Sequence, residues 1–206
     1  MQQLNMTRRT LAAAAIGLAF TIGAAPAQQP GRIRGDIEKA DGAVLALKTR
    51  EGTMLTVKVA DDARVSALVK ASLADIKKDS FVGIAGMPQA DGSVKAFSVH
   101  IFLPAQRGVV ADRHGPWDAR PGSTMTNAYV ESVVQAKDGE TLTVKYKEGE
   151  KKIVITSQTV IAAVAKGDKS ELKAGAQVII FASQKEPDGS LLAKVMYVGR
   201  DVQPAM

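Results

Sequence analysis

Apolar and polar residues alternate with a period of two along most of the chain after residue 30. The clearest segment is Met54–Val59, in which Leu and Val residues alternate with Thr and Lys. This alternation is typical of a half-buried β-strand. Similar patterns, bounded by Asp-Gly and Glu-Gly turns, predict further strands at Arg34–Ala40, Val44–Thr49, Phe81–Met87 and Val94–Leu103.

One segment between these strands has a different spacing. Within Ala67–Asp79 the apolar residues are Leu68, Val69, Leu73 and Ile76. That spacing predicts a short helix, or two turns, between the third and fourth strands.

The whole pattern occurs a second time at a shift of about 97 residues. The turn Asp41-Gly42 corresponds to Asp138-Gly139, and Asp91-Gly92-Ser93 corresponds to Asp188-Gly189-Ser190. We therefore predict an internal duplication in which each copy has five strands and a short helical segment. This order is that of the partly open OB-like barrel.

The predicted fold is all-β, with two tandem five-stranded OB-like barrels. The expected division is a signal peptide at residues 1–27, a first OB-like domain at 28–104, an inter-repeat linker at 105–127 and a second OB-like domain at 128–206. The alternative is a single sandwich or barrel that both copies build together.

The second copy carries Leu142-Thr143-Val144, Thr159-Val160-Ile161 and Leu172-Lys173-Ala174-Gly175. With these motifs the chain resembles an uncharacterised domain family of exported bacterial proteins built from OB-like repeats. The first copy departs from the pattern, with Arg64-Val65 in place of the Thr-x-Ile turn and Asp79 in place of Gly175. Because the motifs are turns and core positions, the resemblance implies a fold and no chemistry.

The linker is also similar to relatives that often carry a metal-transporter-permease label. The sequence contradicts that label, since it has no set of apolar segments long enough for transmembrane helices.

The N-terminus has the features of a signal peptide. Arg8-Arg9 precedes an apolar run at Leu11–Ala24, and Ala25-Pro26-Ala27 is a small-x-small cleavage site. The arginine pair resembles a twin-arginine motif, so export by the Tat or the Sec route is expected. We predict a periplasmic protein with no transmembrane segment in the mature chain.

Composition removes several classes of site. The chain has no cysteine, which excludes disulfides, thiolate zinc sites and cysteine nucleophiles. Without Arg8 and Arg9, the 27 basic residues become 25, against 21 acidic ones, and the two signs are interspersed. The few aromatic residues are spread singly, so a stacking platform for nucleic acid is not expected.

The linker holds the candidate binding residues, including the only tryptophan of the chain. Irregular segments held by rigid elements often carry function. The predicted contact surface comprises Arg113, His114, Trp117, Asp118, Arg120 and Met125. A different interpretation is that Trp117 packs between the copies and the linker only caps them.

Two of these residues suggest metal binding. His114 with Met125 would suit copper, because imidazole and thioether are copper ligands, although no His-rich or Met-rich run accompanies them. His100 is expected in a strand, at the surface or in a cross-strand pair. Ser170 matches the Ser-x-x-Lys motif of serine acyl enzymes without its companion motifs, so Ser170 or Asp168 is expected to cap a helical turn.

The leading hypothesis is a non-enzymatic module that binds an envelope protein, a peptide or an oligosaccharide through the linker. The alternative is periplasmic handling of copper or another divalent metal, with that metal as the only expected cofactor. A carboxylate-based hydrolase is the least favoured, because no two carboxylates are convincingly paired in the sequence.

Overall fold

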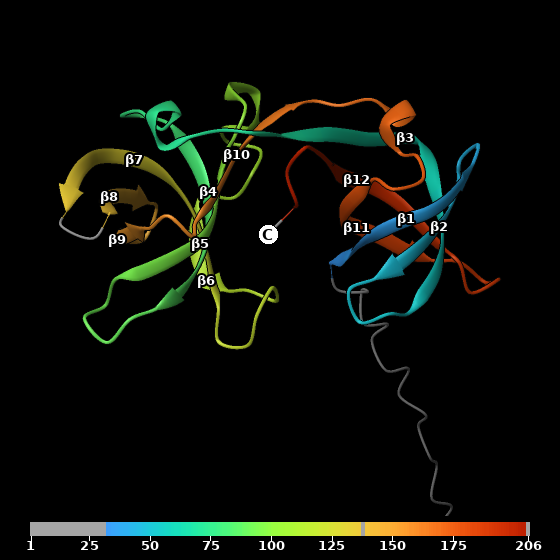
Figure 1. Cartoon of the computed structure of the whole chain (residues 1–206), viewed down its shortest axis with the longest axis horizontal. Helices are drawn as coiled ribbons and strands as arrows, with labels where there is room; N and C mark the ends of the chain where they lie inside the picture. Colours follow the sequence, from blue (N-terminus) through green and yellow to red (C-terminus); the bar gives the residue numbers. More distant parts are fainter. Residues whose placement is uncertain (1–31, 137–138, 205–206) are drawn as a thin grey trace, which may run out of the picture.

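The computed structural model describes residues 32–136 and 139–204, and this part of the chain is almost entirely β-structure (Figure 1). The all-β class is thereby confirmed. The predicted signal peptide, at residues 1–27, and the turn residue Asp138 lie outside the described residues. In chain order the elements are β1 (Ile33–Asp41), β2 (Val44–Thr49), β3 (Met54–Lys70), the 3₁₀ turn η1 (Leu73–Asp75), β4 (Phe81–Pro88), β5 (Val94–Ile101), the 3₁₀ turn η2 (Pro104–Gln106), β6 (Arg113–Pro116), β7 (Thr124–Ala136), β8 (Gly139–Tyr146), β9 (Gly149–Ile155), β10 (Val160–Lys166), the 3₁₀ turn η3 (Lys169–Glu171), β11 (Gln177–Lys185) and β12 (Leu191–Arg200).

Within Ala67–Asp79, where a short helix or two turns was expected, the structure has turns: η1 and a turn at Lys78-Asp79. Strand β3 continues to Lys70, and only η1 is helical. Ala67 and Leu68 are both fully buried although their side chains point to opposite faces. The consecutive apolar residues therefore belong to a strand that is covered on both sides, a pattern that periodicity alone does not separate from a helix.

Five strands close into a barrel, named the first barrel below. Strands β1, β2 and β3 form an antiparallel meander, β12 pairs in parallel with β3, and β11 joins β12 to β1. Its core contains Ile37, Leu45 and Leu47 from the N-terminal half and Ile180 and Met196 from the C-terminal half, each at most 1% exposed.

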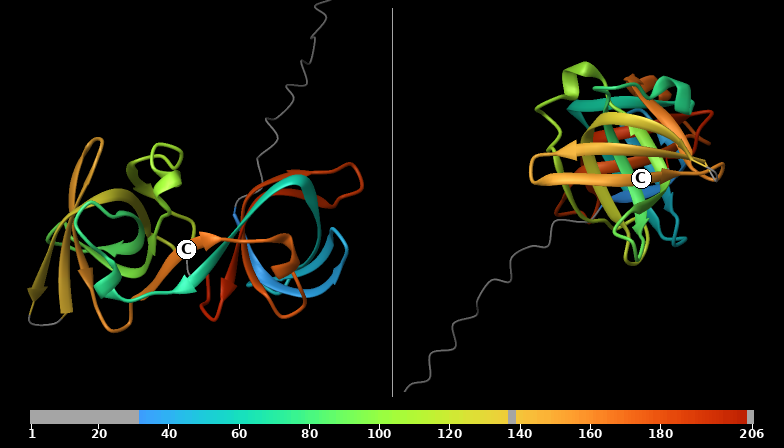
Figure 2. Two further views of the ribbon diagram at one scale, coloured as in Figure 1. Left: turned by 90° about the horizontal axis from the view of Figure 1, so that it is seen from above. Right: turned by 90° about the vertical axis from the view of Figure 1, so that its left-hand side faces the viewer.

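A second set of five strands, named the second ring, has the same connections. Strands β7, β8 and β9 form its meander, β4 pairs with β7, and β5 completes it through a short parallel pairing with β9 at Val94–Ile153. Its core contains Leu142 and Val144 from one half of the chain with Ile84 and Val99 from the other, all 0% exposed. Figure 2 shows the two groups of strands as separate lobes.

Each set takes strands from both halves of the chain, so the expected arrangement of one barrel per half is not shown. The cause lies in β3, which begins in the first barrel and ends beside β10, where Leu68 pairs with Val164. In the second half the corresponding strand is broken into β9 and β10, because Thr159 Oγ1 accepts a hydrogen bond from Thr156 N (3.0 Å) and turns the chain. Arg64 occupies this region in the first half, and β3 runs through it without a turn.

The two sets are joined by β10, which lies between β3 and β5 and makes one continuous sheet of them. A third apolar cluster fills the junction, with Phe81, Phe102, Met125 and Tyr197 among its buried members. Among the described residues, no helix is long and apolar enough to cross a membrane.

Candidate functional site

A cavity of about 480 Å³ lies at the junction of the first barrel and the second ring. One wall comes from the first barrel, with Ser66 of β3 and Tyr197 of β12 paired side by side. The other wall comes from the linker and the strands next to it, with Phe102, Met125 and Asn127. The continuous sheet, in which β10 joins β3 to β5, therefore brings the first barrel and the linker region together at the site.

Trp117 is the aromatic residue of this cavity that the linker supplies. It follows β6, is held by a hydrogen bond from its N to Ser123 O (2.8 Å), and is half-buried. The Arg32 guanidinium lies 3.8 Å from the centre of its ring, a cation–π contact. Its Nε1 atom is buried and has no hydrogen-bond partner among the described residues. A buried indole N–H usually finds an acceptor, so Trp117 Nε1 is an unsatisfied donor beside the cavity.

Asp118 anchors the arginines that lie over Trp117. Its carboxylate accepts a hydrogen bond from Arg34 at 2.7 Å and forms a longer ion pair with Arg32 at 3.3 Å. Burial opposes ionisation of this carboxyl, but the hydrogen bond and charge of Arg34, together with Arg32, lower the pKa of Asp118 below its usual value. Asp118 thus orients Arg32 and Arg34 and is not among the lining residues.

His114 and Met125 do not form a common site. On the antiparallel pair β6–β7, His114 lies opposite Thr126 and Gly115 lies opposite Met125, so His114 and Met125 point to opposite faces. His114 Nδ1 is 2.8 Å from Thr126 Oγ1, and Met125 is buried in the third cluster. In the described part of the chain, no group of three or more His, Cys, Asp or Glu residues could hold a metal ion.

The predicted contact surface therefore divides into separate groups. Arg113, Trp117 and Met125 line the cavity. Asp118 lies outside the lining and binds Arg34. His114 instead packs against Tyr146, with ring centres 5.8 Å apart. Arg120 lies over the ring of Phe97 at 4.0 Å, and neither residue lines the cavity.

Sequence reasoning missed the residues that reach the cavity from outside the linker. Arg32 comes from the segment before β1, and Arg64 comes from the middle of β3. The sequence could have pointed to Arg64, because this arginine stands where the second half has the turn Thr159-Val160-Ile161. His100 was expected at the surface or in a cross-strand pair. It is fully buried, with Nε2 3.3 Å from Ser98 Oγ and Nδ1 without a partner among the described residues.

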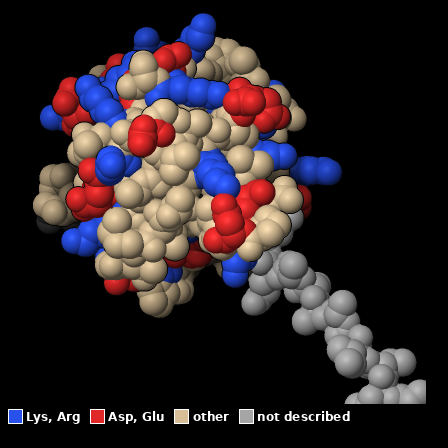
Figure 3. Space-filling view, turned by 90° about the vertical axis from the view of Figure 1, so that its right-hand side faces the viewer, with Lys and Arg blue, Asp and Glu red and all other residues tan. Residues whose placement is uncertain are grey.

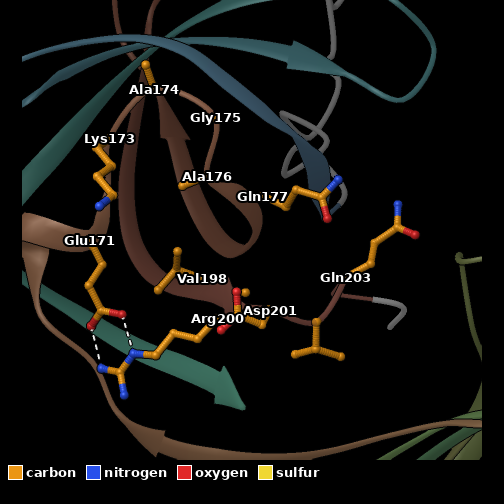
Figure 4. Close-up of a pocket in the computed structure, with 12 residues that line it drawn as sticks. Glu171, Lys173, Ala174, Gly175, Ala176, Gln177, Val198, Arg200, Asp201 and Gln203 are labelled. Carbon is orange, nitrogen blue, oxygen red and sulfur yellow. Dashed lines mark hydrogen bonds and ion pairs between the residues drawn. The ribbon is translucent and has the colours of Figure 1, made fainter. Parts of the chain in front are cut away.

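A second, more open hollow of about 640 Å³ lies between η3 and the end of β12 (Figure 4). Two of its charged residues pair with each other: Glu171 accepts hydrogen bonds from Arg200 Nε (2.5 Å) and Nη2 (2.7 Å), and these bonds lower the pKa of Glu171. At the start of η3, Asp168 caps Ser170 N at 2.8 Å, as expected for Asp168. Because Glu171 and Arg200 bind each other and Asp168 caps η3, these charged groups already have structural roles, and this hollow is the weaker candidate for a binding site.

Residues 131–196 match the family model described as "Domain of unknown function (DUF5666)". The match covers about a third of the chain, from β7 into β12, and agrees with the expected uncharacterised domain family. No curated protein and no solved structure matches the chain. The matched segment contributes strands to both the first barrel and the second ring, and it contains neither the linker nor the cavity arginines.

Proposed function

We propose that the protein is a non-enzymatic binding module, exported to the periplasm, whose ligand occupies the cavity between the first barrel and the second ring. One observation carries the proposal. Trp117 lines the cavity, and its buried Nε1–H has no hydrogen-bond acceptor in the described part of the chain. A buried donor without an acceptor is costly, and a shift of the Trp117 side chain that lets a ligand accept from Nε1 would recover that cost.

The dimensions and lining of the cavity support the same conclusion. Its volume is within the usual range of about 300–1,000 Å³ for small-molecule sites. The lining is mainly apolar and aromatic with a few polar groups, the composition that such sites have. One wall stands on strands β3, β11 and β12, which hold a binding geometry better than loops do, and the linker supplies much of the other wall.

We also propose that the first barrel and the second ring are OB-like units derived from one duplicated unit, with their last two strands exchanged. In both sets the third strand of the meander pairs in parallel with the last strand, as β3 with β12 and β9 with β5. The two Asp-Gly-Ser turns are also built alike: Asp91 and Asp188 each accept a hydrogen bond from the following serine N at 3.0 Å.

Metal handling is not proposed as a second function, because His114 and Met125 face opposite sides of the β6–β7 pair. A hydrolase is not proposed either, because no carboxylate is among the residues that line the cavity.

The test uses Trp117 as an internal reporter, since it is the only tryptophan. The neutral dye phenylnaphthylamine, added to the purified protein, should bind and take up excitation energy from Trp117 by energy transfer. Ser66→Phe and Val195→Phe each fill the cavity and should reduce the dye affinity at least about tenfold, the effect of losing about 1.4 kcal/mol of binding free energy.

The matched control is Val44→Phe, which adds the same ring at an exposed position away from the cavity. This variant should leave the dye affinity unchanged, and thermal unfolding should show that all three variants are folded. Absence of saturable dye binding, or equal binding by all variants, would overturn the proposed site.

A further inference from the structure

The cavity is strongly biased in charge. Three arginines line it (Arg32, Arg64 and Arg113), and no aspartate or glutamate is among the lining residues. The outer surface differs, because basic and acidic side chains are interspersed over the face seen in Figure 3. Charges of one sign are therefore gathered where a small molecule would bind, with Arg64 and Arg113 themselves exposed to solvent.

Two of the arginines are available to a ligand. Arg64 reaches the cavity from β3, and Arg113 reaches it from β6 on the opposite wall. Within residues 32–136 and 139–204, neither side chain has a hydrogen bond or an ion pair to another protein group. Arg32 is partly satisfied by Asp118 and by the Trp117 ring. Each free guanidinium offers a fork of N–H donors that matches a carboxylate or phosphate group.

The rest of the lining calls for an apolar ligand body. Phe102, Phe181 and Tyr197 present ring surface, and Val109 and Val110 contribute from the loop after η2. The Tyr197 hydroxyl accepts a hydrogen bond from Gln106 Nε2 at 2.7 Å and keeps its own O–H, which can donate to an anionic ligand. The cavity thus combines unpaired positive charge with aromatic walls.

From this combination we infer that the ligand is a small anionic amphiphile, a molecule with a carboxylate, phosphate or sulfonate group on an aromatic or acyl body. The anionic group would lie between Arg64 and Arg113, and the apolar body would lie against the aromatic side chains. This inference rests on the proposed binding function and names its ligand class. A cationic ligand is disfavoured by the three positive charges, and a neutral sugar would leave Arg64 and Arg113 unpaired.

The experiment compares two dyes with similar aromatic bodies. Anilinonaphthalene sulfonate is anionic, and phenylnaphthylamine is its neutral counterpart. The native protein should bind the anionic dye at least about tenfold more tightly, because hydrogen bonds to charged groups exceed about 1.4 kcal/mol. Its affinity should fall as salt is raised, while that of the neutral dye should not fall.

Variants then assign the preference to the two arginines. The double substitution R64Q/R113Q should weaken binding of the anionic dye about tenfold or more and change that of the neutral dye less than about twofold. Lys48→Gln removes an equal charge at an exposed position on β2 and should change neither dye. R64K/R113K keeps the charge and should retain part of the preference, because lysine cannot form the bidentate contact.

The outcomes separate the two proposals. Saturable binding of both dyes with equal affinity, or a preference that R64Q/R113Q leaves intact, overturns the anionic ligand class while the binding function stands. If neither dye binds, the proposed function itself fails. If R64Q/R113Q does not fold, the salt dependence of the native protein decides: a flat response for the anionic dye contradicts the inference.

Discussion

Cutting the linker should leave the two halves of the protein together. The perturbation is a protease site inserted between Gly108 and Val109, in an exposed turn where Val109 is 69% exposed. Cleavage there separates the chain into a half with β1–β5 and a half with β6–β12. Tandem barrels would then come apart as two folded fragments. Exchanged strands predict instead a nicked protein that stays associated.

The magnitude follows from the side chains that each half buries in the core of the other. Six large apolar side chains of the C-terminal half are buried in the first barrel: Leu172, Val178, Ile180, Leu191, Met196 and Val198. Five of the N-terminal half are buried in the second ring: Ile76, Val82, Ile84, Val94 and Val99. At about 2 kcal/mol each, these side chains contribute about 22 kcal/mol. Association costs about 10 kcal/mol, which leaves about 12 kcal/mol and a Kd of about 1 nM.

The assay is size-exclusion chromatography with light scattering at a few micromolar protein, roughly a thousand times the expected Kd. The cleaved sample should elute as one species with the mass and the thermal transition of the uncut insertion variant. In guanidinium chloride it should separate into two fragments, which verifies that cleavage was complete. Elution as two separately folded fragments in native buffer would refute the exchanged topology and the cavity built on it.

Three further predictions concern single residues. Burial lowers the pKa of His100 from 6.5 to about 3. Between these pH values the unfolded chain binds a proton at His100 and the folded protein does not, so the free energy of unfolding should fall by about 1.4 kcal/mol per pH unit from pH 6.5 towards 3. His100→Leu should flatten that slope in denaturant titrations. Gly35→Ala should cost at least about 2 kcal/mol, because its Cβ would lie 2.2 Å from Lys48 O, whereas Gly115→Ala, with nothing within 4 Å, should change unfolding by less than about 0.5 kcal/mol. Asp79 has a φ of 64° where the second half has Gly175, so Asp79→Gly should stabilise by about 0.5 kcal/mol in thermal unfolding, and a loss of stability would contradict this explanation.

The local structure was largely predictable because turns and alternation are encoded over a few residues. The strand at Val44–Thr49 was predicted with its observed bounds, and the predicted matching positions Leu45 and Leu142 are both buried, at 1% and 0% exposure. The partners of the strands were not predictable. A strand such as β11 has the same alternation whether it pairs with β1 or with a strand of its own half, so pairing leaves no local signal.

The candidate site was predictable only in part, for the same reason. Trp117 and Arg113 were found because they stand in an irregular segment between two regular patterns. Arg32 and Arg64 were missed because their positions in the cavity depend on which strands come together at the junction. The metal hypothesis rested on the closeness of His114 and Met125 in the sequence. In the structure, the alternation of side chains along β6 and β7 places the two residues on opposite faces.

The pairing of β1 with β11 has a consequence for the order in which the protein can form. During synthesis β1, β2 and β3 emerge first, yet they have no closing partner until Val178 and the residues after it have left the ribosome. The early strands must wait with open edges, and contacts between residues so far apart along the chain are slow to form. A premature stop before β11 would therefore leave the beginning of the protein unclosed, although the missing residues all belong to its end.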